Sequence, residues 1–203
     1  MYDFTAVPNE DGPRVPPAGT IGVFTITDMK QENVETPSGA FIPKVGEKVY
    51  IKVDFANDEF SFDERFYMLN WDAATNTHTF HSAMKRMHHL YHRVTGQELG
   101  NGVTFENLKA QLIGKPIALA VGANIRETDE GIKAYSQLKY MNFARQPQDI
   151  AELSFNTKEA AENARYHGIR AQQSSSNADA ATPSADPMAA MPTGTPAVSD
   201  NKF

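Results

Sequence analysis

The sequence predicts a mainly β domain, a small β-barrel with one main α-helix and a disordered C-terminal tail. Two stretches, 47–55 and 132–143, alternate their side chains with the period of a β-strand. Between them, 77–95 repeats apolar residues at helical spacing. From residue 171 onward large apolar residues are almost absent, so this part cannot pack a core.

The expected elements follow from local composition. An N-terminal arm at 1–17 is rich in proline and charge. Strands rich in β-branched or alternating apolar residues are expected at 20–29, 47–55, 60–71, 116–125 and 132–143, with a short strand at 40–42. Helices are expected at 77–95, 105–112 and from Asn156, and each is followed by a glycine stop (Gly96, Gly114, Gly168). The turn at 128–131 joins the last two strands as a hairpin.

These elements divide the chain into four parts. They are an extended arm at 1–17, a barrel domain at 18–145, a short helical extension at 146–170 and a disordered tail at 171–203. A barrel domain of this size buries enough surface to be stable by itself.

Composition excludes several classes of function. The 203 residues contain no cysteine, which excludes disulfides, thiolate metal sites and thiol catalysis. No apolar run is long enough to span a membrane, and the N-terminus lacks a signal-peptide pattern, so we expect a cytoplasmic protein with no membrane partner. The net charge of −6 argues against a general polyanion binder. However, 77–97 is basic without a carboxylate, whereas 54–64 is acidic, and local potential steers a ligand.

Lysines alternate with tyrosines on two of the expected strands. One face of 132–143 carries Lys133, Tyr135, Gln137, Lys139, Met141 and Phe143, and one face of the earlier strand carries Lys48, Tyr50 and Lys52. Ammonium groups neutralise phosphates and flat rings stack on unpaired bases, which is how proteins hold single-stranded nucleic acid without reading its sequence. In the alternative interpretation, the tyrosines are half-buried strand residues and the lysines protect exposed edges.

The strand between them adds further candidates, Arg65 and Tyr67, with Trp71 at its end. The expected nucleic-acid-binding residues are therefore Lys48, Tyr50, Lys52, Arg65, Tyr67, Trp71, Lys133, Tyr135, Lys139 and Phe143.

The histidine-rich helix allows three interpretations. His88 and His92 are spaced i and i+4 and could share a metal ion, yet no carboxylate lies nearby in sequence, and Lys85 and Arg93 would repel a cation. The same helix could instead be a solvated face or a basic patch that meets phosphates.

The sequence contains few residue patterns that indicate catalysis. Asp54, Asp58, Asp63 and Glu64 could act as acid/base pairs or hold Mg²⁺, but they lie in a polar, turn-prone segment. No nucleophile elbow, phosphate-binding loop or zinc-protease motif is present. We therefore expect no catalytic residues, no metal site, no cofactor and no enzymatic activity.

The C-terminal tip, with Asp200 and Phe203, could offer a carboxylate and an apolar anchor to a partner protein. A featureless terminus is the alternative. The sequence leaves self-association open.

The order of elements resembles an OB-fold, a five-stranded barrel with a helix between strands three and four. Over 15–145 the chain also resembles a phage family of single-stranded-DNA-binding proteins, formerly a domain of unknown function. The segments that carry this resemblance are Pro17-Ala18-Gly19-Thr20, Thr27-Asp28, Lys48 to Phe55, Leu69-Asn70-Trp71, Leu108, Leu112-Ile113-Gly114-Lys115-Pro116 and Tyr140 in the final strand.

The resemblance implies an OB-like barrel that binds single-stranded DNA in phage replication or recombination, in the host cytoplasm, and it supplies no catalytic residues. The tip is similar to the acidic, phenylalanine-ended tails of single-stranded-DNA-binding proteins, through which replication or recombination partners would be recruited. It departs from them in having few acidic residues, and in Lys202 where proline is usual. The remaining alternatives are a protein-interaction or virion-associated β domain, or a metal-dependent nuclease.

Overall fold

The computed structural model describes residues 14–35, 42–100, 102–129 and 131–180. The strands are β1 (Thr20–Glu32), β2 (Val34–Glu35), β3 (Ile42–Pro43), β4 (Val49–Ala56), β5 (Ser61–Asp72), β6 (Thr77–Phe80), β7 (Pro116–Thr128) and β8 (Gly131–Asn142). The helices are η1 (Ser82–Met84, a 3₁₀ turn), α1 (Lys85–Thr95), α2 (Phe105–Leu112), α3 (Pro147–Ala151) and α4 (Thr157–Ala180). The fold is mainly β, as the sequence predicts.

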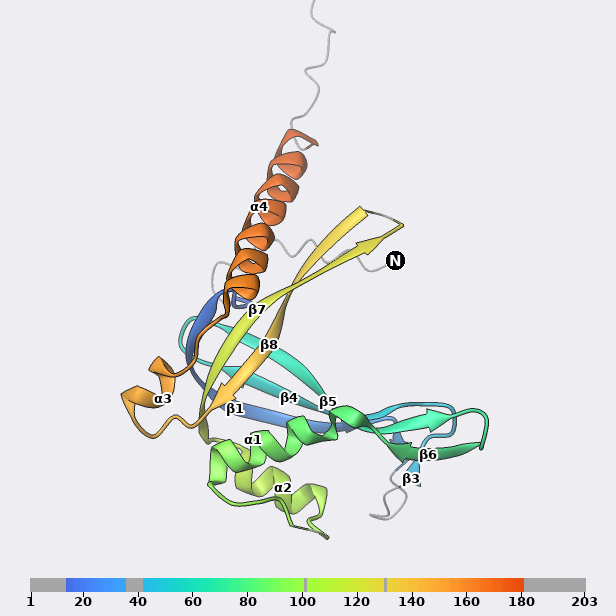
Figure 1. The fold of residues 1–203 in the computed structure, drawn as a ribbon. Helices are drawn as coiled ribbons and strands as arrows, with labels where there is room; N and C mark the ends of the chain where they lie inside the picture. The colour runs from blue at the N-terminus through green and yellow to red at the C-terminus, as the bar shows by residue number, and fades with distance from the viewer. Residues whose placement is uncertain (1–13, 36–41, 101, 130, 181–203) are drawn as a thin grey trace, which may run out of the picture.

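Six strands form one antiparallel sheet in the order β6-β5-β4-β1-β7-β8. β1 serves both halves of this sheet, because Thr20–Thr25 pairs with β7 and Thr25–Glu32 pairs with β4. A bulge between Ile26 and Asp28 bends the strand between the two halves. The sheet therefore curls into a barrel-like shape, with α1 and α2 below β1 in the view of Figure 1.

Side chains, and not strand pairing, connect β5 to β8. These two strands are not neighbours in the hydrogen-bonded order of the described sheet. Instead, the Arg86 guanidinium of α1 donates to Glu64 Oε1 on β5 and to the Leu138 carbonyl oxygen on β8, both at 3.0 Å. The Glu64 carboxylate also accepts the Leu138 backbone N–H. We call this contact the seam bridge.

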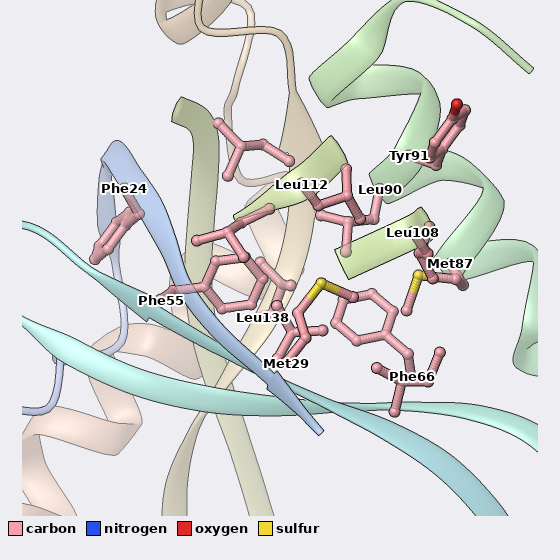
Figure 2. Close-up of a cluster of buried hydrophobic side chains, with 14 of the residues drawn as sticks. Phe24, Met29, Phe55, Phe66, Met87, Leu90, Tyr91, Leu108, Leu112 and Leu138 are labelled. Carbon is pink, nitrogen blue, oxygen red and sulfur yellow. The ribbon is translucent and has the colours of Figure 1, made fainter. Parts of the chain in front are cut away.

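The core lies between the curled sheet and the two helices. β4 buries Val49, Ile51, Val53 and Phe55 in strict alternation, which confirms the strand predicted there. Figure 2 shows side chains from the sheet and from α1 and α2 pointing into one cluster. The labelled members of the cluster are Phe24, Met29, Phe55, Phe66, Met87, Leu90, Tyr91, Leu108, Leu112 and Leu138.

The helix predicted at 77–95 is wrong at its beginning. Residues 77–80 form β6, whose Phe80 pairs with Leu69 of β5, and α1 begins only at Lys85. Pairing with β5 supplies the hydrogen bonds that a helix would otherwise make, and Phe80 is left 77% exposed. The prediction of the helix end is confirmed, because Gly96 caps α1 with φ 79°.

The C-terminal helix is longer than the sequence predicts. Its beginning is confirmed, because Asn156 Oδ1 accepts the Glu159 N–H at 3.0 Å as an N-cap. The expected stop at Gly168 is wrong: α4 continues to Ala180, so 171–180, assigned to the disordered tail, are helical. Tyr166 packs against β7 and β8, so tertiary contact offsets the cost of the glycine. The rest of the predicted tail, 181–203, lies outside the described residues, and so do Asp200 and Phe203.

α4 packs against the part of β7 that lies beyond the end of its pairing with β1. The β1–β7 pairing ends at Thr20 opposite Val121. Just beyond, buried Asn163 accepts the Ala123 N–H through Oδ1 at 2.8 Å, and Figure 1 shows α4 beside the β7–β8 hairpin. Of the helices described, none combines the length and apolar character needed to cross a bilayer.

Candidate nucleic-acid interface

Four of the predicted residues meet on the solvent-facing side of β4 and β5. Tyr50 lies directly opposite Tyr67, and Lys52 lies opposite Arg65. Along β4, the side chains of Val49, Ile51 and Val53 point into the core, so those of Tyr50 and Lys52, which alternate with them, point outward. The two tyrosine rings are 5.6 Å apart between centroids. The expectation that Tyr50 and Lys52 share the outward face of their strand is confirmed, and the register of β4 and β5 adds Arg65 and Tyr67 to that face.

The tyrosine pair is extended on both sides. The Arg65 guanidinium lies 5.1 Å from the Tyr50 ring centroid, and the His81 ring stacks on Tyr67 at 5.0 Å with an interplanar angle of 23°. Sequence reasoning missed His81, because it was assigned to a helix, whereas the β6–η1 turn brings it to this face. We call Tyr50, Lys52, Arg65, Tyr67 and His81 the tyrosine face.

Carboxylates border the tyrosine face. The Lys52 ammonium lies 3.5 Å from Asp54 Oδ1 and 3.7 Å from Asp63 Oδ1. Partial burial alone would lower the pKa of Lys52, but the charges of Asp63 and Asp54 outweigh it, and the pKa is raised. A phosphate would have to compete with two carboxylates for Lys52, so Arg65, which has no ion pair among the described residues, is the more available cation here.

Lys48 and Trp71 lie outside the ring contacts of this face. Lys48 is exposed and immediately precedes β4. Trp71 pairs across strands with His78 and packs edge-on against its ring at 4.9 Å. His78 in turn hydrogen-bonds the Glu47 carbonyl oxygen at 2.9 Å. Trp71 is therefore engaged with β6 and not with the tyrosine pair.

The prediction that alternate side chains of 132–143 share one face is confirmed only for the first part of β8. Lys133 and Tyr135 lie opposite Arg126 and Asn124 of β7, and Tyr135 is 49% exposed. These four residues, which we call the hairpin face, carry the lysine–tyrosine pattern that the sequence predicts.

A bulge at Lys139 breaks the alternation further along β8. The register shifts between Val121–Leu138 and Ala120–Tyr140. Met141, expected beside the lysines, packs against the core cluster instead. A bulge moves the side chains that follow it to the other face, and nothing in the local sequence of β8 marks its position.

β4 and β8 are not adjacent strands. β1 and β7 separate them in the sheet. The lysine–tyrosine alternation also leads us to expect that single-stranded DNA lies across a barrel face formed by the strands at 48–52 and 132–143. The structure places these two strands apart, with two strands between them.

The remaining predicted residues, Lys139 and Phe143, meet the histidine-rich helix. A groove of about 770 Å³ lies between α1 and β8. It is lined on the α1 side by Met84, Lys85, Arg86, His88, His89, His92 and Arg93, and elsewhere by Glu98, Lys139, Tyr140 and Met141. We call it the α1–β8 groove. Phe143, just after β8, lies beside it with its ring 4.9 Å from the Arg93 guanidinium and 4.6 Å from that of Arg145.

The acidic residue Glu64 has a structural position. Its side chain is 13% exposed. Burial raises the pKa of the Glu64 carboxyl, although Arg86 and the Leu138 N–H act in the opposite direction. Because Glu64 is engaged in the seam bridge, it does not join Asp54 and Asp63 on the outer face.

Within the described part of the chain, one carboxylate lies within 4.0 Å of a histidine ring nitrogen. His92 Nε2 lies 3.8 Å from Glu98 Oε1. Across the part of the chain that the structure describes, no group of three or more histidine, cysteine, aspartate or glutamate side chains is placed to hold a metal ion.

Comparison with protein-family models and with curated protein sequences finds no match to this chain.

Proposed function

We propose that this protein binds single-stranded DNA without reading its sequence, and that the tyrosine face is its base-stacking surface. The observation that carries the proposal is the row formed by Arg65, Tyr50, Tyr67 and His81, because consecutive planar groups on one solvent-facing side of a sheet, here half-buried at the three rings, match the stacking platforms of such proteins. The barrel-like fold supports it, since barrels of this kind commonly present a sheet face to oligonucleotides.

The biological role follows from the resemblance described above. We propose that the protein acts on single-stranded intermediates of phage DNA replication or recombination, in the cytoplasm of the host cell. Binding and protection of the strand require no catalytic group, so the proposal includes no enzymatic activity. Recruitment of replication or recombination proteins through Asp200 and Phe203 belongs to the same proposal.

The experiment is a fluorescence-anisotropy titration of labelled oligo-dT and of a matched duplex, at low and moderate salt. We expect tight binding to the single strand alone, weakened by salt because bound phosphates release counterions. Tyr50→Ala and Tyr67→Ala should each cost about 1–3 kcal/mol, or about 5- to 150-fold in Kd, if each ring stacks on one base.

Phe80→Ala is the matched control, because it removes an exposed aromatic ring from β6 that is not part of the tyrosine face. It should leave the affinity unchanged. Thermal unfolding of each variant shows whether the fold is retained. Unchanged affinity in folded Tyr50→Ala and Tyr67→Ala would remove the tyrosine face from the site.

A protein-interaction domain remains the alternative, and the carboxylates beside Lys52 are the observation that favours it. This alternative would be supported if the affinity for DNA did not change with salt concentration and did not differ between single-stranded and double-stranded probes. Cleavage of a labelled oligonucleotide that requires divalent metal and is lost in His88→Ala would instead indicate a nuclease.

A further inference from the structure

The α1–β8 groove is lined by several cationic side chains, most of which have no carboxylate partner among the described residues. Arg86 is paired with Glu64 in the seam bridge, but no carboxylate oxygen among the described residues lies within the 4.0 Å ion-pair distance of the other cations that line or flank the groove. These cations are Lys85, Arg93, Lys139 and Arg145. The one carboxylate in the lining, Glu98, has an 83% exposed side chain and its contact is with His92.

The contrast with the tyrosine face is electrostatic. There, Lys52 already has two carboxylates within 4.0 Å. Lys139 lines the groove, and its stem lies over Gly122 beside Phe155. Its ammonium acts on Glu159 from beyond the 4.0 Å ion-pair distance, and Glu159 is already bonded to the Tyr140 hydroxyl at 2.6 Å. An anion entering the groove therefore gains attraction without first displacing a protein carboxylate.

Phe143 holds two of these cations in place. The Arg93 and Arg145 guanidinium carbons lie 4.9 and 4.6 Å from its ring centroid, a cation–π distance. Arg145 also packs against Gly96, where a Cβ atom would clash with Nη2. A side chain at this position would push Arg145 away, so the glycine that ends α1 also makes room for the guanidinium. Guanidinium groups held in this way match phosphate oxygens with little loss of side-chain entropy.

Apart from the histidines, Tyr140 supplies the aromatic ring of the groove lining. This ring lies against Phe155, and its hydroxyl donates to Glu159. Phe143, beside the groove, has two guanidinium groups and the His92 ring around it. With more cations than aromatic side chains of this kind, the groove favours phosphates over nucleobases.

We infer that the α1–β8 groove binds the phosphodiester backbone of a nucleic-acid strand, as a site separate from the tyrosine face. The inference rests on the proposed function, because the ligand is the same single strand. The tyrosine face holds the bases of one segment, and the groove holds the phosphates of another through Lys85, Arg93, Lys139 and Arg145.

The test uses two labelled probes in fluorescence-anisotropy titrations with the full chain. One is oligo-dT, and the other is an abasic oligodeoxynucleotide of equal length, which has phosphates but no bases. The variant Arg93→Gln/Lys139→Gln removes two groove charges and keeps long side chains. The matched control, Lys158→Gln/Arg165→Gln, removes the same net charge from exposed positions on α4.

We expect the abasic probe to bind the wild type and the control, and to lose at least ten-fold in affinity for the groove variant. For oligo-dT, the slope of log Kobs against log salt should become shallower by about 1.4 in the groove variant, at about 0.7 for each lost phosphate contact on a single strand. Tyr50→Ala/Tyr67→Ala should weaken oligo-dT binding but leave abasic binding unchanged.

The groove inference is overturned if the groove variant matches the charge-matched control with both probes while the wild type still binds oligo-dT. That result would leave the tyrosine face as the only site and the proposed function intact. If the wild type binds both probes equally and only the groove variant is impaired, base stacking is refuted and the groove stands. If the wild type binds neither probe, both proposals fail together.

Discussion

Removing Arg86 should open the seam between β5 and β8. Its guanidinium makes two hydrogen bonds of 3.0 Å, to Glu64 and to the Leu138 carbonyl oxygen, and lies 5.5 Å from the Phe66 ring centroid. In Arg86→Met the methionine fills part of the volume but leaves Glu64 without its cationic partner. The Glu64 side chain is only 13% exposed, so water replaces that partner poorly.

The cost follows from these contacts. Breaking a buried ion pair by removing one partner costs about 3–5 kcal/mol. The Arg86 side chain is itself 31% exposed, which places this pair near the lower limit. We therefore expect Arg86→Met to lower the free energy of unfolding by about 3 kcal/mol.

The charge of Glu64 supplies the control. In Arg86→Met/Glu64→Gln no carboxylate is left unpaired, so the double variant should lose about 1–2 kcal/mol less than the sum of the two single variants. The pH dependence has a definite sign. Burial already raises the pKa of Glu64, and loss of Arg86 raises it further. The protonated acid carries no charge to bury, so the deficit of Arg86→Met should be smaller at pH 5 than at pH 8.

Urea denaturation at the two pH values, followed by far-ultraviolet circular dichroism, measures these differences. The reasoning is refuted if the single and double variants lose their stability additively and the Arg86→Met deficit is independent of pH. In that case the polar contacts across the seam would contribute nothing that depends on the Glu64 charge.

Two further predictions concern stability. Asn163→Ala should lower the free energy of unfolding by about 1–3 kcal/mol, because the Ala123 N–H loses its buried acceptor. Hydrogen exchange at the Ala123 amide should become faster in this variant. An unchanged exchange rate would contradict the prediction. The Met29 N–H and the Lys109 ammonium lower the pKa of Asp28 to about 2, so its stabilising contribution is present above pH 4 and is lost as the pH falls towards 2. Wild type should therefore lose more stability than Asp28→Asn over that range in urea denaturation, and parallel profiles would contradict this.

Local patterns in the chain predicted much of the fold. The alternation along β4 identifies its buried and outward faces, and therefore places Tyr50 and Lys52 on the solvent side. Gly96 and Gly114, with φ of 79° and 76°, end α1 and follow α2 as expected, because glycine adopts the left-handed conformation without a steric penalty. The turn at 128–131 joins β7 to β8, with Thr128 opposite Gly131.

Contacts between distant segments decided the rest. The β-branched residues Thr77 and Thr79 favour a strand, but the apolar helical spacing of the following segment extends back to Phe80. Pairing with the end of β5 selects the strand and brings His81 to Tyr67. The bulge at Lys139 is likewise a matter of register between β7 and β8.

The sequence by itself determined which side chains are the candidates for binding: the lysine–tyrosine strands, the basic helix and the acidic segment are all visible in it. Only the tertiary structure decided how they are grouped. It pairs Lys52 with Asp54 and Asp63 and separates β4 from β8. It also places α1 against β8 to form a groove in which Lys85, Arg93 and Lys139 have no carboxylate within 4.0 Å among the described residues. The physical reason is that local periodicity fixes the direction of a side chain relative to its own strand or helix. The neighbours of that side chain depend on how distant elements pack to bury one shared core.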